Sequence, residues 1–193
     1  MKGQAKIALL ALLGLIVLGG LGLTAYGVST YNSMVRLHEQ IPGAFAQVNV
    51  VLQRRNDLIP NLVSTVKGFA KQEQAVIKEV TDARAALGGA RNPAEKIAAN
   101  GQLDGALSRL LVVVENYPQL KSNENFLRLQ DELAGSENRI AIERRKYNET
   151  VQRYNTDIEL FPNSIAASMF GFQRNDAYFK TEPGARNAPK VSF

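Results

Sequence analysis

Residues 133–161 read LAGSENRIAIERRKYNETVQRYNTDIELF, and this stretch carries the pattern that decides the fold. Large apolar residues recur in it at every seventh position, namely Leu133, Ile140, Tyr147, Tyr154 and Phe161. A seven-residue step keeps one seam of an α-helix turned toward a partner helix. The stretch therefore predicts a long last helix, from about residues 118–122 to residue 160, that packs along other helices.

Polar residues follow the same step beside the apolar seam, with Asn148 and Asn155 as one such pair. Polar residues at such places set the register of helix pairing at some cost in stability. We hypothesise a structural polar network with at least one partly buried interhelical pair. Its predicted members are Arg55, Asp57, Glu137 and Arg144. The alternative is that they are exposed charges worth about 0–1 kcal/mol per pair.

Upstream of this helix, apolar residues from Tyr31 to Leu87 recur in steps of mostly 3, 4 or 7, which is helical spacing. Pro42 and Pro60 fall inside the pattern. Each lacks a backbone N–H and crowds the preceding turn, so we expect each to kink or break the helix. The glycine pair at 88–89 should end it.

The residues Asn92-Pro93-Ala94-Glu95 predict the start of another helix. Asn92 is a good N-cap, Pro93 suits the first helical position, and Glu95 can reach back to the cap. We expect this helix to run to about Asn116. No stretch alternates with period 2, and short connections favour antiparallel neighbours, so the sequence predicts an all-α, up-and-down bundle of long, kinked helices.

The N-terminal residues 1–6 are basic, and residues 7–28 contain no charged side chain. Twenty-two such residues suffice to span a hydrocarbon core of about 30 Å. The alternative is a cleaved signal peptide with Gly20-Leu21-Gly22 as its cleavage site. Because the apolar run continues to Leu23, we favour an uncleaved transmembrane anchor that contacts membrane lipid.

The charges beside the anchor predict its orientation. Lys2 and Lys6 flank one side, whereas Arg36, His38 and Glu39 flank the other. By the positive-inside rule, we expect a single-pass protein of the cell inner membrane with a cytoplasmic N-terminus and a periplasmic bundle.

The composition argues against several classes of function. The net charge is +5, but acidic residues are interleaved with the basic ones, unlike the basic face of a nucleic-acid binder. There is no Cys, and His38 is the only His, so no catalytic or metal-ligating constellation is visible. We expect no enzymatic activity, no cofactor and no small-molecule substrate.

Near the C-terminus we predict a surface for a partner or a second copy of the chain. A short helix should begin after Ser164 and carry an apolar stripe, and the last residues end in two alternate apolar side chains. The predicted surface consists of Ile165, Met169, Phe170, Phe172, Val191 and Phe193. The stripe alternatively covers an open end of the bundle or meets lipid, and the tail is alternatively disordered.

Several motifs together resemble the signature of the LemA family. They are RRNDLIPNLV at 54–63, TVKG at 65–68, YPQLK at 117–121, ENRIA at 137–141, RRKYN at 144–148, Tyr154-Asn155, and PKVSF at 189–193. The resemblance is collinear from Tyr31 to Phe193. It implies an N-terminal membrane helix, an antiparallel four-helix bundle, and neither enzymatic activity nor a cofactor. Some descriptions of the family imply an N-terminus outside the cell, against the charge distribution.

These observations divide the chain into a basic N-terminus (1–6), an anchor (7–28), a LemA-like bundle (29–172) and a C-terminal tail (173–193). One branch of the family is associated with magnetosome membrane formation, which implies a membrane-organising scaffold. The first hypothesis is therefore an envelope scaffold that self-associates as a homo-oligomer or binds an envelope partner. The second is a sensor or adaptor that relays a signal to a partner protein through the membrane helix.

Overall fold

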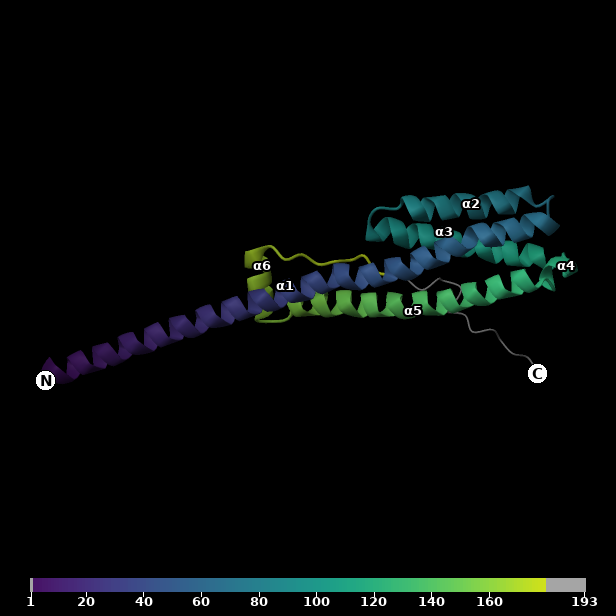
Figure 1. Cartoon of the computed structure of the whole chain (residues 1–193). Helices are drawn as coiled ribbons and strands as arrows, with labels where there is room; N and C mark the ends of the chain where they lie inside the picture. The colour runs from purple at the N-terminus through teal and green to yellow at the C-terminus, as the bar shows by residue number, and fades with distance from the viewer. Residues whose placement is uncertain (1, 180–193) are drawn as a thin grey trace, which may run out of the picture. The chain divides into compact units, whose positions relative to one another are not determined.

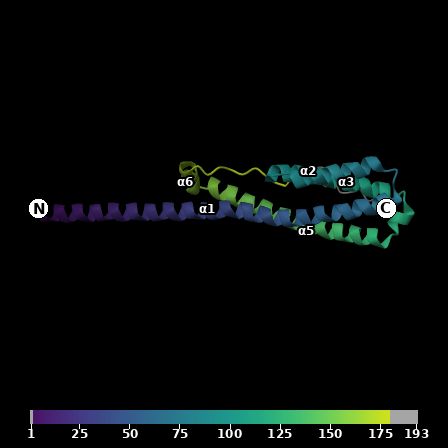
Figure 2. The ribbon, with the colours of Figure 1, turned by 45° about the horizontal axis from the view of Figure 1, so that its top comes forward.

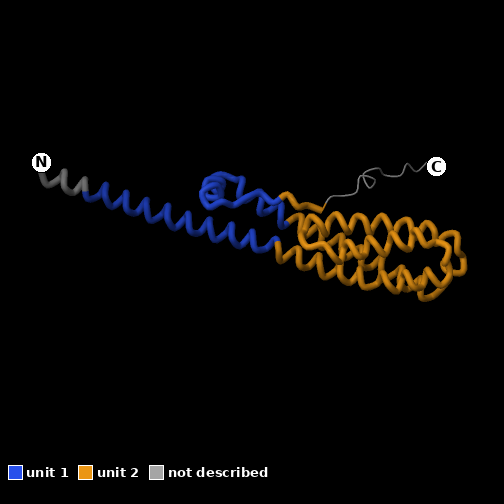
Figure 3. The backbone as a smooth tube through the Cα atoms, turned by 90° about the horizontal axis from the view of Figure 1, so that it is seen from above, with its two compact units in different colours: residues 1–41, 150–175 blue, residues 42–149, 176–193 orange. Residues whose placement is uncertain are grey.

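The computed structural model describes residues 2–179, with side chains from Leu10 onward, and this part of the chain is all-helical, as the sequence predicts. Its helices, in chain order, are α1 (Lys2–Phe69), α2 (Gln74–Gly89), α3 (Pro93–Val114), α4 (Pro118–Lys121), α5 (Glu124–Glu159) and α6 (Asn163–Phe170) (Figure 1). The chain forms two compact units, coloured separately in Figure 3. Unit 1 comprises Met1–Ile41 and Thr150–Asn175, and unit 2 comprises Pro42–Glu149 and Asp176–Phe193.

In unit 2, α2 and α3 pack side by side as a hairpin (Figures 1 and 2). The start of α3 is capped as predicted, because the Asn92 side chain accepts a hydrogen bond from the Glu95 N–H at 2.9 Å. The core of the unit draws on all its long helices. It includes Val48, Leu52, Ile59, Leu62, Val66, Ile77, Val80, Leu87, Leu103, Leu107, Leu110, Phe126, Ile140 and Tyr147.

Pro60 lies inside α1 without breaking it. A proline at this place leaves the carbonyl of Asn56, four residues earlier, without its helical N–H donor. In unit 2, Arg84 of α2 donates its Nε–H to that carbonyl at 3.2 Å. Arg84 therefore supplies the hydrogen bond that Pro60 removes, and it ties α2 to α1 at the same point.

The end of α1 differs from the sequence expectation. The apolar periodicity predicts one kinked helical run up to the glycine pair at 88–89, but the chain leaves helix after Phe69 and resumes it at Gln74. A turn closes the gap, with the Glu73 N–H donating to the carbonyl of Ala70, which is itself buried. The pattern misses this turn because the step from Phe69 to Val76 is seven, which is also a helical step.

In unit 1, the first part of α1 is not buried by the rest of the described chain. Every side chain from Leu10 to Tyr26 is exposed, and Thr30 is the first buried residue. Within residues 2–179, α1 is the one helix long and apolar enough to cross a membrane, and its apolar part is not buried. This exposed stretch coincides with the anchor predicted at residues 7–28.

The seam of α5 is buried at its centre and ends before its last predicted member. Ile140 and Tyr147 are fully buried and Tyr154 is 1% exposed, but Phe161 is 81% exposed. The prediction for Phe161 is wrong because α5 ends at Glu159, so helical periodicity no longer decides where its side chain points.

The chain after α6 is extended and is held by two asparagines of α5. In unit 1, Asn155 donates to the Asn175 carbonyl at 2.7 Å and accepts from the Asn175 N–H at 2.9 Å. In unit 2, Asn148 makes the same pair of bonds with Phe179, at 2.8 and 3.0 Å. Phe179 is buried, so the packed part of the chain extends beyond the boundary predicted at residue 172.

Candidate functional site

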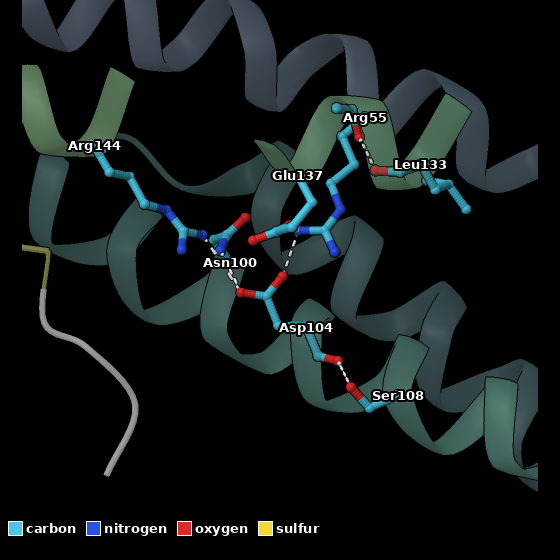
Figure 4. A network of polar contacts seen from close by, with 8 residues as sticks. Arg55, Asn100, Asp104, Ser108, Leu133, Glu137 and Arg144 are labelled. Carbon is cyan, nitrogen blue, oxygen red and sulfur yellow. Dashed lines mark hydrogen bonds and ion pairs between the residues drawn. The ribbon is translucent and has the colours of Figure 1, made fainter. Parts of the chain in front are cut away.

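A polar site in the described part of unit 2 joins α1, α3 and α5. Arg55 of α1, whose side chain is 7% exposed, pairs with Asp104 of α3, and its Nη1 also lies 2.8 Å from Glu137 Oε2 of α5 (Figure 4). Arg144 of α5 reaches the other oxygen of Asp104 at 3.4 Å. Asn100 donates to that same oxygen at 2.8 Å. We call Arg55, Asn100, Asp104, Glu137 and Arg144 the Asp104 cluster.

Two arginines and two carboxylates balance the formal charge of the Asp104 cluster. Balance matters because a buried ion left without its partner costs several kcal/mol, roughly 3–5 for a broken buried pair. Asp104 holds both arginines, so it is the centre of the arrangement. Because it receives partners from two other helices, the cluster fixes how three helices of unit 2 are registered.

The Asp104 cluster is not fully satisfied. The Nε atoms of Arg55 and Arg144 and Oδ1 of Asn100 are buried without a hydrogen-bond partner. Glu137 Oε2 also lacks one, although it is within ion-pair distance of Arg55, because the contact does not have hydrogen-bond geometry. Since every charged side chain in the cluster faces an opposite charge, its chemistry is that of structural pairing.

Three of the four residues predicted for the polar network come together: Arg55, Glu137 and Arg144. Asp57 does not join them, which corrects the expectation. It is exposed and accepts a hydrogen bond from Gln53 at 2.7 Å. The reason is geometric, because two residues along a helix turn the side chain by about 200°, away from the face that Arg55 occupies.

Sequence reasoning missed Asp104, although a signal was present. Asn100, Leu103 and Leu107 follow helical steps of three and four on the buried face of α3. Asp104 comes four residues after Asn100 and directly after Leu103, so it borders that face. A carboxylate at the border of a core face needs a partner, and Arg55 and Arg144 meet this need.

The predicted partner surface is only partly described. On α6, Ile165, Met169 and Phe170 are 56%, 76% and 51% exposed. Phe172 is half-buried, with its ring 5.8 Å from that of Tyr31. Val191 and Phe193 lie outside the described residues, so their predicted docking remains a prediction.

Residues suited to catalysis or metal binding do not converge in residues 2–179. Within this range, no group of three His, Cys, Asp or Glu side chains is placed to hold a metal ion. His38 is exposed, lies 3.7 Å from Glu39, and packs its ring edge-on against Tyr154 at 5.5 Å. Its contacts are those of a surface histidine at the edge of unit 1.

An open hollow of about 610 Å³ lies between the end of α1 and α2. It is lined by Lys67, Lys71, Gln74, Ile77, Lys78 and Thr81. Lys78 already pairs with Asp82, and the lysines stand at the solvent surface. Such a lining offers loose electrostatic attraction for an anion and does not enclose one.

Three tyrosines outside the apolar stretch have raised pKa values. The hydrogen bond to Glu73 is the main cause that raises the pKa of Tyr117. Burial is the main cause that raises the pKa of Tyr147, and the nearby Tyr178 raises it further. Burial also raises the pKa of Tyr154, although the hydrogen bond to the Gln173 carbonyl acts in the opposite direction. Each of these phenols is held neutral, as suits packing and hydrogen bonding.

Sequence comparison identifies relatives over most of the chain. A Magnetosome protein MamQ 2 from Paramagnetospirillum magneticum is 28% identical over 199 residues, covering 90% of this chain and 73% of the relative. The MamQ of Magnetospirillum gryphiswaldense is 27% identical, covering 79% and 65%. A Protein LemA from Metamycoplasma hominis is 22% identical, covering 72% and 64%.

The family itself is recognised over a longer continuous region than any of the quoted motifs. A sequence profile of the LemA family matches residues 44–193, which includes all the motifs that suggested the resemblance. Because this match covers more than half of the chain, the protein belongs to the LemA family.

Proposed function

We propose that this protein is a membrane-anchored, non-enzymatic structural protein of the cell envelope that self-associates or binds an envelope partner. The observation that carries the proposal is α1, one helix from Lys2 to Phe69. It bears the exposed apolar stretch at its start and Arg55 of the Asp104 cluster farther along. In α1 the predicted membrane anchor continues without a break into the helices of unit 2. This continuity suits a protein that holds copies of itself or a partner protein at a membrane.

Two further observations support a structural role. The charged side chains of the Asp104 cluster form ion pairs with one another, and these pairs link α1, α3 and α5. The similarity to proteins named for the magnetosome supports a part in organising a membrane. The inner membrane, with the body on the periplasmic side, is the location that the charges beside the anchor favour.

The second candidate is a sensor or adaptor that relays a signal to a partner through the membrane helix. It is favoured by the same continuity of α1, since a movement of an unbroken helix at the membrane is passed along its axis. A scaffold and an adaptor differ in stoichiometry. The scaffold assembles with itself into large species, whereas the adaptor stays a monomer or dimer with one defined partner.

The experiment is the molar mass of the full-length protein in mild detergent and in lipid nanodiscs, measured over a range of protein concentrations. The chain has no Cys, so a Gly89→Cys variant gives one cross-linking site on each copy. A Cβ at Gly89 meets no atom within 4 Å, so this change should not disturb the fold. Stable large species, together with cross-linked dimers in native membranes, support the scaffold. A monomer or dimer that recovers one protein in fixed ratio supports the adaptor instead.

A further inference from the structure

The turn before α6 and α6 itself expose apolar side chains that the rest of unit 1 does not cover. Leu160 is 56% exposed, Phe161 81%, Ile165 56% and Met169 76%. Ile165 and Met169 are four residues apart and share one face of the helix. Ala167, on another face, is buried. The helix therefore lies with one side against unit 1 and an apolar side outward.

Contacts with α1 fix the position of α6 within unit 1. Tyr26 donates its hydroxyl to Asn163 Oδ1 at 3.2 Å, at the start of α6. Tyr31 packs edge-on against Phe170, with ring centroids 4.9 Å apart, at the end of α6. Tyr26 lies near the end of the apolar stretch of α1, and Tyr31 follows that stretch. Figures 1 and 2 show α6 beside this part of α1.

The level of these contacts along α1 is that of a bilayer surface. Residues 7–28 extend about 33 Å as a helix, against a hydrocarbon core of about 30 Å. Tyr26 stands two residues, or about 3 Å, before the end of that stretch. Tyrosines are enriched at membrane–water boundaries because the ring is apolar and the hydroxyl is polar. With residues 7–28 spanning the bilayer, as proposed above, Asn163 of α6 would lie at the boundary between acyl chains and headgroups.

The part of α1 that contacts α6 and the segment that contains α6 are both free of charged residues. On α1, the first charged residue after Lys6 is Arg36, and residues 160–173 contain no charged residue. The nearest charges of the second segment, Glu159 and Arg174, pair with each other. Two separate segments of the chain are therefore free of charge at the place where they meet, next to the apolar stretch.

We propose that residues 160–170 form a second membrane contact, in which α6 lies at the bilayer surface and Phe161, Ile165 and Met169 insert among the phospholipid acyl chains beside α1. The occupant of the exposed face of α6 is lipid. This occupant is chosen because Tyr26 and Tyr31 hold α6 beside the end of the apolar stretch of α1. A short helix with an apolar side at the headgroup boundary is the arrangement of an interfacial helix. The inference rests on the anchoring proposed above and adds a second, in-plane attachment.

The chain contains no Trp, so one introduced Trp is a unique fluorescent probe. The full-length variants Phe161→Trp and Met169→Trp would be reconstituted in vesicles of phosphatidylcholine and phosphatidylglycerol whose acyl chains carry bromine near the headgroup or near the chain end. We expect emission at short wavelength and stronger quenching by the shallow bromine than by the deep one. Two positions are used so that the result does not depend on one side chain.

Two matched variants set the limits of the scale. Leu18→Trp, in the middle of the apolar stretch, should be quenched most by the deep bromine, and it reports the anchoring itself. Gln152→Trp, exposed on α5 and about 10 Å from the end of that helix, should emit as in water and escape quenching. Should Leu18→Trp escape quenching, the anchor and the second contact both fail.

If Leu18→Trp is quenched as expected, the α6 variants decide the proposal alone. Long-wavelength, unquenched emission from Phe161→Trp and Met169→Trp would mean that water covers the face. Short-wavelength emission without quenching would mean that a second copy or another protein covers it. Either result overturns the proposal and leaves the anchor in place.

Discussion

At the scale of single residues, the most consequential side chain in the described part of the protein is Asp104. It accepts from Arg55 and Asn100 and pairs with Arg144, so three helices of unit 2 meet at one carboxylate. Removing the Asp104 carboxylate would take an ion-pair partner from both Arg55 and Arg144. Arg55 would keep Glu137 as a partner, but Glu137 does not pair with Arg144.

The first prediction is that Asp104→Asn destabilises the full-length protein by about 3 kcal/mol, the low end for a broken buried pair, because Asp104 is 21% exposed. For a chain of this size, the melting midpoint should fall by roughly 6–12 °C, measured by circular dichroism in detergent. Asp57→Asn is the matched control on α1 and should cost under about 1 kcal/mol. Equal effects of the two substitutions would contradict the role given to Asp104.

Two buried tyrosines of α5, seven residues apart, differ in one respect. The Tyr147 hydroxyl is buried without a hydrogen-bond partner, and the Tyr147 ring packs against the rings of Phe45 and Phe179. The Tyr154 hydroxyl donates to the Gln173 carbonyl at 2.8 Å. The pair therefore separates the cost of burying a hydroxyl from the gain of bonding it.

The second prediction is that, at pH 7, Tyr147→Phe leaves stability unchanged or raises it by up to about 1 kcal/mol, while Tyr154→Phe lowers it by about 1 kcal/mol. The pKa of Tyr147 is raised above its ordinary 10.0 by burial, so the folded state favours the neutral phenol. Below pH 10 the phenol is neutral in both the folded and the unfolded state, and above it the unfolded state releases a proton that the folded state keeps, so the free energy of unfolding falls as pH rises toward the raised pKa. Tyr147→Phe should therefore soften the loss of stability above pH 10. A melting midpoint that falls at pH 7 in Tyr147→Phe would refute this account.

At the scale of elements, α5 serves two tasks with one sequence period. Its apolar seam is buried against neighbouring helices. Beside the seam, Asn148 and Asn155 each form two hydrogen bonds with the backbone of one residue in the segment that follows α6. An amide side chain can donate and accept at once, so it pairs with a backbone peptide as a neighbouring strand would.

The third prediction is that Asn155→Ala loosens the extended segment while α5 stays helical. The change removes the two neutral hydrogen bonds to the Asn175 backbone, together worth about 1–3 kcal/mol. Hydrogen–deuterium exchange should speed up in peptides that cover residues 173–176, with helical content by circular dichroism unchanged. Asn138→Ala, on an exposed face of α5, is the control and should leave exchange there as it was.

The elements could be predicted where local chemistry decides them. The start of α3 follows from Asn92-Pro93 and Glu95, whose hydrogen bonds are local, and the course of α5 follows from its seam. The turn after Phe69 was missed because the apolar step across it is helical in length. Asp104 was missed because its partners are 49 and 40 residues away along the chain. The side that α6 turns outward depends on where Tyr26 and Tyr31 lie, which no local pattern states.

At the scale of the whole molecule, the orientation of the apolar stretch determines on which side of the membrane unit 2 lies. The charge distribution around residues 7–28 favours a cytoplasmic N-terminus. The absence of Cys from the sequence makes single-cysteine labelling direct.

The fourth prediction is that Gly89→Cys reacts with a membrane-impermeant maleimide in intact cells with a permeabilised outer layer, whereas Gln4→Cys reacts only after lysis. The two cysteines stand on opposite sides of the apolar stretch, so each is the control for the other. Labelling of Gln4→Cys in intact cells, with Gly89→Cys protected, would reverse the orientation.

The unbroken course of α1 also has a consequence for biosynthesis. The ribosome makes Arg55 and the apolar side chains of α1 before it makes Asp104, which lies 49 residues later. At about 5–20 residues per second, Arg55 waits roughly 2–10 s for its first partner and longer for Glu137. During that interval the apolar stretch is already available to the insertion machinery, and the face of α1 that packs in unit 2 still lacks its partners from α3 and α5. Assembly of the Asp104 cluster therefore follows the synthesis of α5, well after the apolar stretch of α1 has been made.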